Sequence, residues 1–372
     1  MGFYAGLVRP LLFRLDPESA HRLAIASAGA LRWSSGVMRR MTAVADPRLE
    51  TRVAGLRFAT PIGLAAGFDK SGVAIAFLAG LGFGSVEIGS VSADPSGGNP
   101  RPRLFRLPDD RAIAVAYGVP NDGAMAVAEH VRGLHLPVPL GINIVKTNRG
   151  KEWPPEKAED IIADYVAATR ILAPFASYLM FNLSCPNTED GRDFFADASR
   201  LREWLAAIGE TGLRLPVFLK VSPLGGIEMI ERMLAVADEA SFVSGFMYNL
   251  PPLMPSGLLT SEAARRTTRG AVSGPPSARL AGFCIRQTYL RMDRKRHIVL
   301  GAGGVASAED AYRKLKYGAS LVQLLTSLVY EGPGVVRRIT AGLLELLERD
   351  GVRHVSEVVG TEAGAKQTGE GE

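Results

Sequence analysis

Short apolar runs with the length of β-strands alternate with longer segments of helical periodicity, and this alternation constrains the fold more than any other feature. Eight strand-like runs occur, at 61–69, 84–91, 139–145, 178–184, 216–222, 245–250, 297–304 and 321–328. Helices are expected at 155–172, 198–209, 227–240, 306–317 and 334–349, among others. Eight strands followed by helices predict an α/β fold of the (β/α)8, or TIM barrel, type. An open doubly wound sheet is the alternative, although no GxGxxG motif opens the first βα unit.

The N-terminal residues carry an amphipathic stripe instead of strands. Seven apolar residues fall on one helical face: Phe3, Tyr4, Leu7, Val8, Leu11, Leu12 and Leu15. Asp16 followed by Pro17 supplies the N-cap and the first-turn proline of a second helix, so two short helices are expected before the barrel. The apolar stripe fits packing against the protein's own core. It also fits a membrane interface, where the nearby Arg14 and Arg22 would favour anionic lipids.

These patterns divide the chain into three parts. Residues 1–45 form the predicted helical extension, and residues 46–355 form the predicted barrel. Residues 356–372 are rich in Gly, Glu and Thr, and we expect this tail to be disordered. The 372-residue length is compatible with one barrel that carries insertions.

Charge and cysteine content argue against several classes of protein. The 43 Lys and Arg residues exceed the 38 Asp and Glu residues only slightly and are spread along the chain, so we expect no nucleic-acid partner. Two cysteines make no disulfide framework, and neither they nor the five histidines have metal-ligand spacing, so no metal site is expected. No apolar run approaches the roughly 20 residues that span a bilayer. Charges at Arg9, Arg14 and Asp16 argue against a signal peptide.

Polar side chains gather where the predicted strands end, which is where a barrel of this type carries its chemistry. Asn143, Asn182 and Asn249 lie at or near three strand ends, where an ordinary barrel core would have apolar residues. Lys70, Lys146 and Lys220 lie at or just beyond others. Three lysines at one mouth favour an anionic substrate or cofactor, including the negative charge that develops on an isoalloxazine ring. A Schiff-base lysine is the alternative.

The loops after the last two strands are candidates for phosphate binding. The run Gly301–Gly304 ends the seventh strand, and Ser307 can cap the helix that follows. Backbone N–H groups and a helix N-terminus could therefore face an anion there. Ser273, Gly274 and Thr326 could complete the site.

The two cysteines have different surroundings. Cys185 follows the fourth strand between Asn182 and Asn187, in a loop that Pro186 stiffens. A free cysteine is most often a buried apolar filler, but these polar neighbours favour a catalytic thiol. Its thiolate would act as nucleophile or general base. Cys284 lies in an apolar helical segment and is expected to be a packing residue.

Taken together, the strand-end motifs resemble dihydroorotate dehydrogenase from residue 1 to about residue 355. The matching segments are PIGLAAGFDK at 61–70, VEIGS at 86–90, GNPRPRLFRL at 98–107, GINIVK at 141–146, NLSCPNT at 182–188, Leu219–Lys220 and residues 301–334. The N-terminal helices and RLFRL at 103–107 resemble the membrane-associated, quinone-using class. In that class the two helices form the mouth of a quinone tunnel, and His21 and Arg106 match tunnel residues.

The resemblance implies FMN at the barrel mouth and oxidation of dihydroorotate to orotate, a step of pyrimidine biosynthesis, with a membrane quinone as acceptor. The FMN phosphate would lie on Gly274, Gly303, Gly304, Leu325 and Thr326. The other flavin contacts implied are Ala66, Gly67, Lys70, Ser90, Asn143, Asn182, Lys220 and Tyr248. The substrate positions implied are Lys70, Asn182, Asn187 and Asn249. Cys185 holds the position of the base that removes a proton from C5, while hydride leaves C6 for the flavin. A peripheral membrane protein is implied, on the cytoplasmic face of the inner membrane in a bacterium.

Three departures from the family pattern concern the substrate. The quinone class normally has serine where Cys185 stands. Val115 replaces an amide that binds orotate, and losing such a polar partner would cost about 1 to 3 kcal/mol of binding. Leu250 removes a hydroxyl. Two alternatives therefore stand beside dihydroorotate oxidation: a paralogous FMN oxidoreductase for another small cyclic amide or acid, and a flavin-binding protein whose role is not catalytic.

Overall fold

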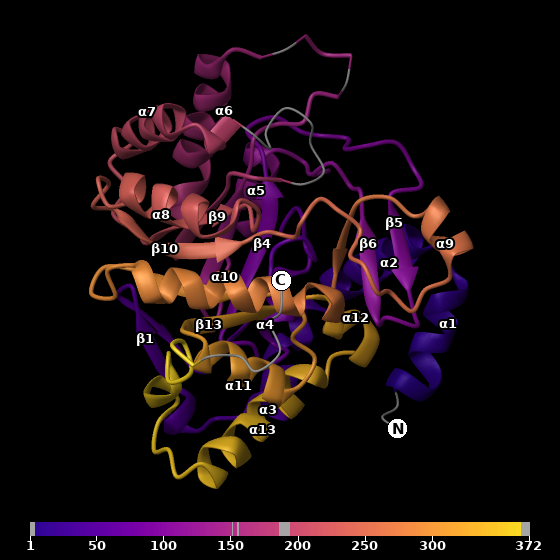
Figure 1. Cartoon of the computed structure of the whole chain (residues 1–372). Coiled ribbons are helices and arrows are strands. Elements are labelled where there is room, and N and C mark those ends of the chain that lie inside the picture. The colour runs from indigo at the N-terminus through magenta and orange to yellow at the C-terminus, as the bar shows by residue number, and fades with distance from the viewer. Residues whose placement is uncertain (1–3, 151, 155, 186–193, 366–372) are drawn as a thin grey trace.

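The computed structural model describes residues 4–150, 152–154, 156–185 and 194–365. Eight parallel strands close into a barrel in which each strand pairs with the next along the chain and the last pairs with the first (Figure 1). They are β3 (Ile62–Leu64), β4 (Ser85–Val91), β7 (Leu140–Ile144), β8 (Tyr178–Asn182), β9 (Val217–Val221), β10 (Val243–Tyr248), β12 (Ile298–Gly301) and β13 (Ala319–Leu324). All eight overlap the predicted runs, so the (β/α)8 prediction is confirmed.

Helices surround the barrel, as their amphipathic patterns predict (Figure 1). They are α4 (Ile75–Ala79), α5 (Ala124–Val131), α6 (Ala158–Leu172), α7 (Ala198–Gly209), α8 (Gly226–Ala237), α10 (Ala278–Arg291), α11 (Ala308–Lys316) and α13 (Val335–Arg349). The main hydrophobic cluster lies between these helices and the strands. A second cluster includes Tyr178, Phe218 and Met247 from the barrel strands, and Phe58 from the hairpin of β1 (Thr51–Val53) and β2 (Leu56–Phe58).

A small antiparallel sheet, which the sequence did not predict, lies outside the barrel. Its strand order is β11-β6-β5, and its strands are β5 (Leu104–Leu107), β6 (Ala112–Val115) and β11 (Ala271–Ser273). The short helices α9 (Glu262–Thr267) and α12 (Thr326–Glu331) follow β10 and β13. These insertions account for much of the length beyond a minimal barrel.

The N-terminal helices, which we call the cap, are η1 (Tyr4–Val8), α1 (Arg9–Arg14), α2 (Pro17–Ala30), η2 (Arg32–Ser34) and α3 (Ser35–Thr42). The cap begins beside the small sheet with α1 and α2 and continues to α3, which packs against α4 (Figure 1). The Asp16 carboxylate accepts the Ser19 N–H at 2.8 Å, which is the expected N-cap of α2. The two expected helices are thus present, and α3 follows them. No helix in the described part of the chain is long and apolar enough to cross a bilayer.

The C-terminal segment differs from the prediction. Residues 356–365 are packed instead of disordered: Gly360 N–H donates to Leu315 O at 3.0 Å, and Glu362 N–H donates to Lys316 O at 2.9 Å. The Ala363 side chain is buried. Composition suggested a loose tail, but these contacts with α11 order the segment. The rest of the predicted tail, 366–372, lies outside the described residues. Five short 3-10 turns complete the described part of the chain: η3 (Pro47–Leu49), η4 (Ala173–Phe175), η5 (Phe194–Ala196), η6 (Pro275–Ser277) and η7 (Val355–Val358).

Candidate active site

A cavity of about 430 Å³ lies at the carboxyl ends of the strands, between the barrel mouth, the small sheet and the cap. It is lined by these predicted flavin, substrate, base and tunnel residues: Ala66, Gly67, Lys70, Ser90, Asn182, Cys185, Lys220, Tyr248, Asn249, Gly274, Gly303, Gly304, Leu325, Thr326, His21 and Arg106. Asn143 lies behind this surface, and Asn187 lies outside the described residues. The structure thus gathers residues far apart in sequence, while their individual roles stay predictions.

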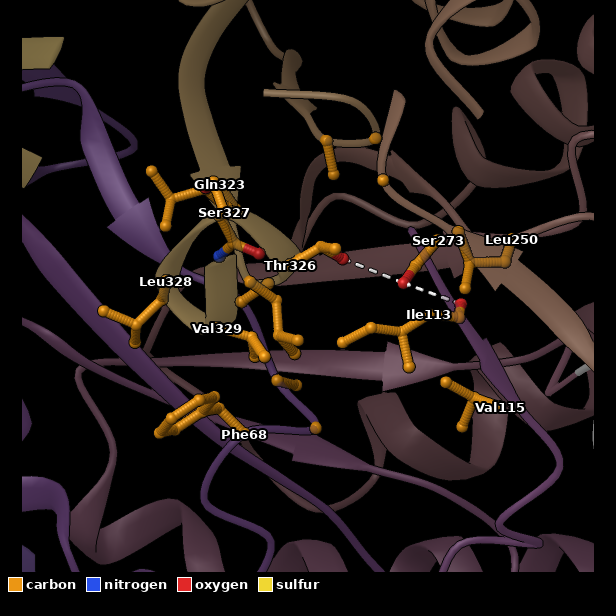
Figure 2. Close-up of a pocket in the computed structure, with 18 of the residues that line it drawn as sticks. Phe68, Ile113, Val115, Leu250, Ser273, Gln323, Thr326, Ser327, Leu328 and Val329 are labelled. Carbon is orange, nitrogen blue, oxygen red and sulfur yellow. Dashed lines mark hydrogen bonds between the residues drawn. The ribbon is translucent and has the colours of Figure 1, made fainter. Parts of the chain in front are cut away.

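One end of the cavity is shaped by glycines. Gly303 and Gly304 have φ of +82° and +70°, which favour glycine. A Cβ at Gly304 would lie 2.5 Å from the Ala278 Cβ, so a larger residue would not fit without movement. In the same cavity, Ser273 Oγ and Thr326 Oγ1 lie 2.8 Å apart, and Thr326 is the first residue of α12 (Figure 2). Small residues, hydroxyls and a helix start form a cradle suited to an anion.

The predicted cap of α11 is confirmed, and it limits that helix's part in the cradle. Ser307 Oγ accepts the Asp310 N–H at 3.2 Å, and the Asp310 carboxylate accepts the Ser307 N–H at 3.1 Å. This capping box satisfies N–H groups at the α11 N-terminus from within the chain. The glycine loop and the start of α12 are therefore the candidate anion site.

A continuous chain of hydrogen bonds runs from the barrel interior to the cavity. Glu87 on β4 is fully buried and accepts Asn143 Nδ2–H at 3.0 Å. Ser90 Oγ donates to Asn143 Oδ1 at 2.5 Å and accepts Asn182 Nδ2–H at 3.1 Å. Asn249 Nδ2 then donates to Asn182 Oδ1 at 2.7 Å. Sequence reasoning singled out the amides but not Glu87, whose inward position depends on strand register.

Two of the three predicted lysines line the cavity. Burial lowers the pKa of Lys220, although the nearby Glu87 charge opposes this. Burial also lowers the pKa of Lys70 to about 8, and its Nζ lies 4.2 Å from the centroid of the Tyr117 ring. Lys146 is different, because it pairs with the buried Glu156 and is not part of the cavity surface. The expectation of three lysines at one mouth is therefore wrong for Lys146.

Cys185 lies just after β8, and 6% of its surface is exposed. Tyr165 on α6 donates from its hydroxyl to the Asn182 carbonyl at 2.7 Å, which anchors the backbone that leads to this thiol. Cys284 is a buried residue of α10, and its Sγ lies 3.6 Å from Pro223 O. Burial raises the pKa of Cys284 to about 12, so its thiol stays protonated at neutral pH. Cys185 lines the cavity and Cys284 does not, while the catalytic role of Cys185 stays a prediction.

Tyr248 lines the cavity with the other predicted flavin residues, but its hydroxyl is bonded elsewhere. Its hydroxyl lies 2.5 Å from Thr288 Oγ1 on α10, in the layer between the barrel and the helices. The hydroxyl is therefore engaged outside the cavity, although Tyr248 contributes to the cavity wall.

The cap closes the other side of the cavity. The Nε2 atom of His21, on α2, lies 3.3 Å from the Nζ atom of Lys70. Burial and the Lys70 charge lower the pKa of His21 to about 3, so this imidazole is neutral. Arg106 on β5 donates to the carbonyls of Leu15 at 2.9 Å and Leu12 at 3.2 Å. Arg106 therefore holds the turn between α1 and α2 as well as lining the cavity.

The residues that depart from the family pattern also line the cavity. Val115 ends β6, and Leu250 follows β10; neither brings a hydrogen-bonding side chain (Figure 2). Ile113 and Pro251 extend the same apolar surface. The cavity thus has one wall of amides and lysines and another wall that is apolar.

Several buried polar atoms of the cavity have no hydrogen-bond partner among the described residues. They are Tyr117 OH, Gln323 Oε1 and Ser327 Oγ. Buried polar groups are normally paired, so these atoms point to a polar ligand. In the part of the chain that the structure describes, no three His, Cys, Asp or Glu side chains group as metal ligands would.

Comparison with known proteins agrees with this geometry. The sequence pattern of the family described as "Dihydroorotate dehydrogenase" matches residues 48–347. "Dihydroorotate dehydrogenase (quinone)" of Sphingopyxis alaskensis is 40% identical over 363 residues, 96% of each chain. The protein with the same name in Acidithiobacillus ferrooxidans is 40% identical over 370 residues, 96% of this chain and 99% of its own. The crystal structure of DHODH from Eimeria tenella in complex with ferulenol has a TM-score of 0.80 at 29% identity, covering 94% of this chain and 96% of that one. The chain therefore belongs to the dihydroorotate dehydrogenase family, in its quinone class.

Proposed function

We propose that this protein oxidises dihydroorotate to orotate, in pyrimidine biosynthesis, and passes the electrons to a membrane quinone through bound FMN. The observation that carries the proposal is one cavity that joins an anion cradle, an amide-rich barrel mouth and an apolar cap. The nearly full-length similarity to quinone-dependent relatives supports it.

Two features of the cavity support FMN as its cofactor. Its phosphate would lie against Gly274, Gly303, Gly304 and Thr326, where a Cβ on Gly304 would collide with Ala278. Family members are flavin-dependent, and the unpaired Gln323 Oε1 and Ser327 Oγ would gain partners on a polar ring or its side chain. When bound, FMN would accept a hydride from dihydroorotate and deliver electrons to quinone.

The chain's own residues would then orient the substrate and move one proton. Asn182, Asn249 and Lys70 are placed to hold the polar edge and the carboxylate of dihydroorotate, because amide and ammonium groups recognise such groups. Cys185 would remove the proton from C5 as a thiolate. An ordinary cysteine thiol has a pKa of about 8.5, close enough to neutral pH for this role. The apolar cap would exclude water from this step.

The cap would also connect the cavity to the membrane. Its inner residues Leu12, Ala20 and Ala24 line the cavity. Its outer face exposes large apolar side chains: Leu7, Leu11, Leu15, Leu23, Leu31, Trp33, Val37 and Met41. A helical surface of this kind favours insertion into a lipid interface, and the arginines beside it favour anionic lipids. The protein would thus be a peripheral membrane protein, on the cytoplasmic face of the inner membrane in a bacterium.

The test is a stopped-flow spectrum of the purified yellow protein mixed anaerobically with dihydroorotate, followed by a short-chain quinone. Loss of the flavin absorbance on mixing, and its return with quinone, is the expected result. Flavin that stays oxidised with every substrate tried would favour the non-catalytic alternative.

A second candidate function follows from the apolar wall that Val115 and Leu250 form. Such a wall would suit a small cyclic amide or acid with an apolar edge. Flavin bleaching by such compounds, but not by dihydroorotate, would favour this paralogous oxidoreductase.

The same wall yields a prediction for dihydroorotate itself. Val115→Asn should raise kcat/KM for dihydroorotate by about tenfold, because it returns a hydrogen-bond partner to the wall. Val91→Asn, which buries an amide away from the cavity, should lower stability without that gain. An unchanged or lower kcat/KM in Val115→Asn would favour the paralogous function.

A further inference from the structure

The buried carboxylate of Glu87 has no part in the proposed chemistry, yet it accepts three hydrogen bonds. Asn143 Nδ2 donates to Glu87 Oε1, while Gln323 Nε2 at 2.8 Å and Tyr178 OH at 3.1 Å donate to Oε2. Glu87 is 0% exposed, so water does not supply these bonds. Glu87 is therefore a fixed acceptor at the centre of the barrel.

An acceptor that cannot donate sets the direction of every bond attached to it. A carboxylate accepts only, so Asn143 must turn its NH₂ toward Glu87 and its carbonyl oxygen toward Ser90. Ser90 must then donate to Asn143, at 2.5 Å, which leaves its lone pairs to accept from Asn182. The Asn182 amide thus points its NH₂ inward and its carbonyl oxygen outward.

The outermost amide of this hydrogen-bonded series, Asn249, reaches the substrate side of the cavity. Asn249 Nδ2 donates to Asn182 Oδ1 at 2.7 Å and to Ser184 O at 3.0 Å. Both of its amide hydrogens thus have acceptors, and Asn249 Oδ1 remains an acceptor at the cavity. In this series of hydrogen bonds, every donor points toward Glu87. The orientation of Asn249 therefore depends on a carboxylate from which three hydrogen-bonded residues separate it.

We propose that Glu87 is a positioning residue that makes the cavity amides present acceptors to an N–H edge of the substrate ring. The inference rests on the proposed function only in naming that ring as dihydroorotate or orotate. Glu87 also places a negative charge beside Lys220, which lines the cavity. It therefore acts on the flavin site through charge and on the substrate site through bond direction.

Glu87→Gln tests both effects at nearly constant side-chain volume. The neutral amide accepts more weakly and can also donate, so the direction of the chain is no longer enforced. We expect the Kd of orotate, from its perturbation of the flavin spectrum, to rise about fivefold. We also expect a more positive flavin midpoint potential, because losing a negative charge favours the reduced flavin. A Kd within twofold of wild type would overturn the proposal.

A double variant tests whether an acceptor-only group elsewhere in the network can replace Glu87. In Glu87→Gln/Asn143→Asp the acceptor-only group moves to position 143, where it accepts from both Gln at 87 and Ser90. The outer part of the chain should regain its direction, and orotate affinity should return to within about twofold of wild type. An affinity as weak as that of Glu87→Gln would overturn the directional role. Should the single variant not fold, the double variant decides alone: its orotate affinity should lie within about twofold of wild type, and a weaker affinity would overturn the directional role.

Tyr178→Phe is the matched control, because it removes a donor from the same carboxylate on the side away from the amide chain. It should lower the Tm yet leave orotate affinity and potential unchanged; an equal loss of affinity would show a general packing effect and overturn the proposal. A wild-type protein that neither binds orotate nor reacts with dihydroorotate would contradict the proposed function instead. The midpoint potentials, measured by dithionite titration, would still test Glu87.

Discussion

The cavity has two walls that are built in different ways. The barrel wall consists of side chains on neighbouring parallel strands, linked by the bonds from Glu87 to Asn249. The cap wall consists of helices attached by a few contacts between distant parts of the chain. Tyr4 OH donates to Val329 O at 2.7 Å, and Arg9 Nη1 donates to Tyr330 O at 2.9 Å.

This difference indicates which functions should be separable. The barrel wall depends on strand register, so disturbing it should impair substrate oxidation directly. The cap wall depends on those few contacts and presents exposed leucines to its surroundings, so disturbing it should impair quinone access and membrane contact first. Variants in each wall can break one half-reaction and spare the other.

The largest effect is expected from Cys185→Ala in the barrel wall. Removing a general base costs typically 10²- to 10⁴-fold, so flavin reduction by dihydroorotate should fall by about that factor while FMN stays bound. Reoxidation of dithionite-reduced flavin by quinone should be unchanged. Cys185→Ser should keep measurable activity with its pH optimum moved upward. Cys284→Ala is the control, and rapid reduction in Cys185→Ala would end the assignment.

The next effect concerns the attachment of the cap. The Glu18 carboxylate on α2 makes a bidentate pair with Arg103, at 2.8 and 3.2 Å, and both side chains are buried. Glu18→Gln leaves Arg103 without its counter-charge, which should destabilise the protein by about 3 kcal/mol. Thermal unfolding should show this, and quinone turnover should fall more than flavin reduction. Glu129→Gln, which removes an exposed pair with Arg132, should leave the Tm unchanged.

Acid should weaken the same attachment. Burial alone would raise the pKa of Glu18, but its bonds to Arg103 and the charge of Arg101 outweigh this and lower it. A lowered pKa stabilises the fold above the unfolded-state pKa, and this contribution is lost as pH falls through the folded-state value. The Tm difference between wild type and Glu18→Gln should therefore shrink at low pH. A difference independent of pH would contradict the role of the ion pair.

The eight strands and their order could be predicted because apolar periodicity and the count of βα units leave few alternatives. The glycine turn at the cavity could be predicted because glycines after the seventh strand allow positive φ and close approach, while its binding of an anion stays a prediction. Strand register was harder. Glu87 lies within an apolar run, and only the closed barrel shows that it points inward. Lys146 follows β7, and Lys220 lies near the end of β9. Lys146 nevertheless pairs with Glu156 and is not part of the cavity surface.

A smaller effect concerns the pH dependence of flavin reduction. It should come from Lys70, which lies where the barrel wall meets the cap wall. Burial lowers the pKa of Lys70 to about 8, although the charges of Asp69 and Glu18 oppose this. The ammonium is therefore lost as pH rises through 8, and with it the attraction for the substrate carboxylate. We expect kcat/KM for flavin reduction to fall by about tenfold per pH unit well above pH 8. Lys70→Arg should abolish that decline, because a guanidinium stays protonated; an unchanged decline would exclude Lys70 as its cause.

The smallest effect should come from the outer face of the cap. Trp33 is 78% exposed, and an indole on an amphipathic surface favours the membrane interface. Burying a large apolar side chain contributes about 1.5 to 3 kcal/mol when complete, and less at an interface. Trp33→Ser should therefore weaken binding to anionic liposomes by a few fold in a sedimentation assay and leave flavin reduction intact. Trp153→Ser is the matched control. Trp153 is also exposed, at 53%, but it follows β7 in the sequence, and the Arg149 Cζ lies 5.2 Å from the centroid of its ring. Because Trp153 lies outside the cap, its loss should not change liposome binding. Equal weakening in both variants would mean that the cap has no special part in membrane contact, and the separation of the two walls would then apply to the half-reactions alone.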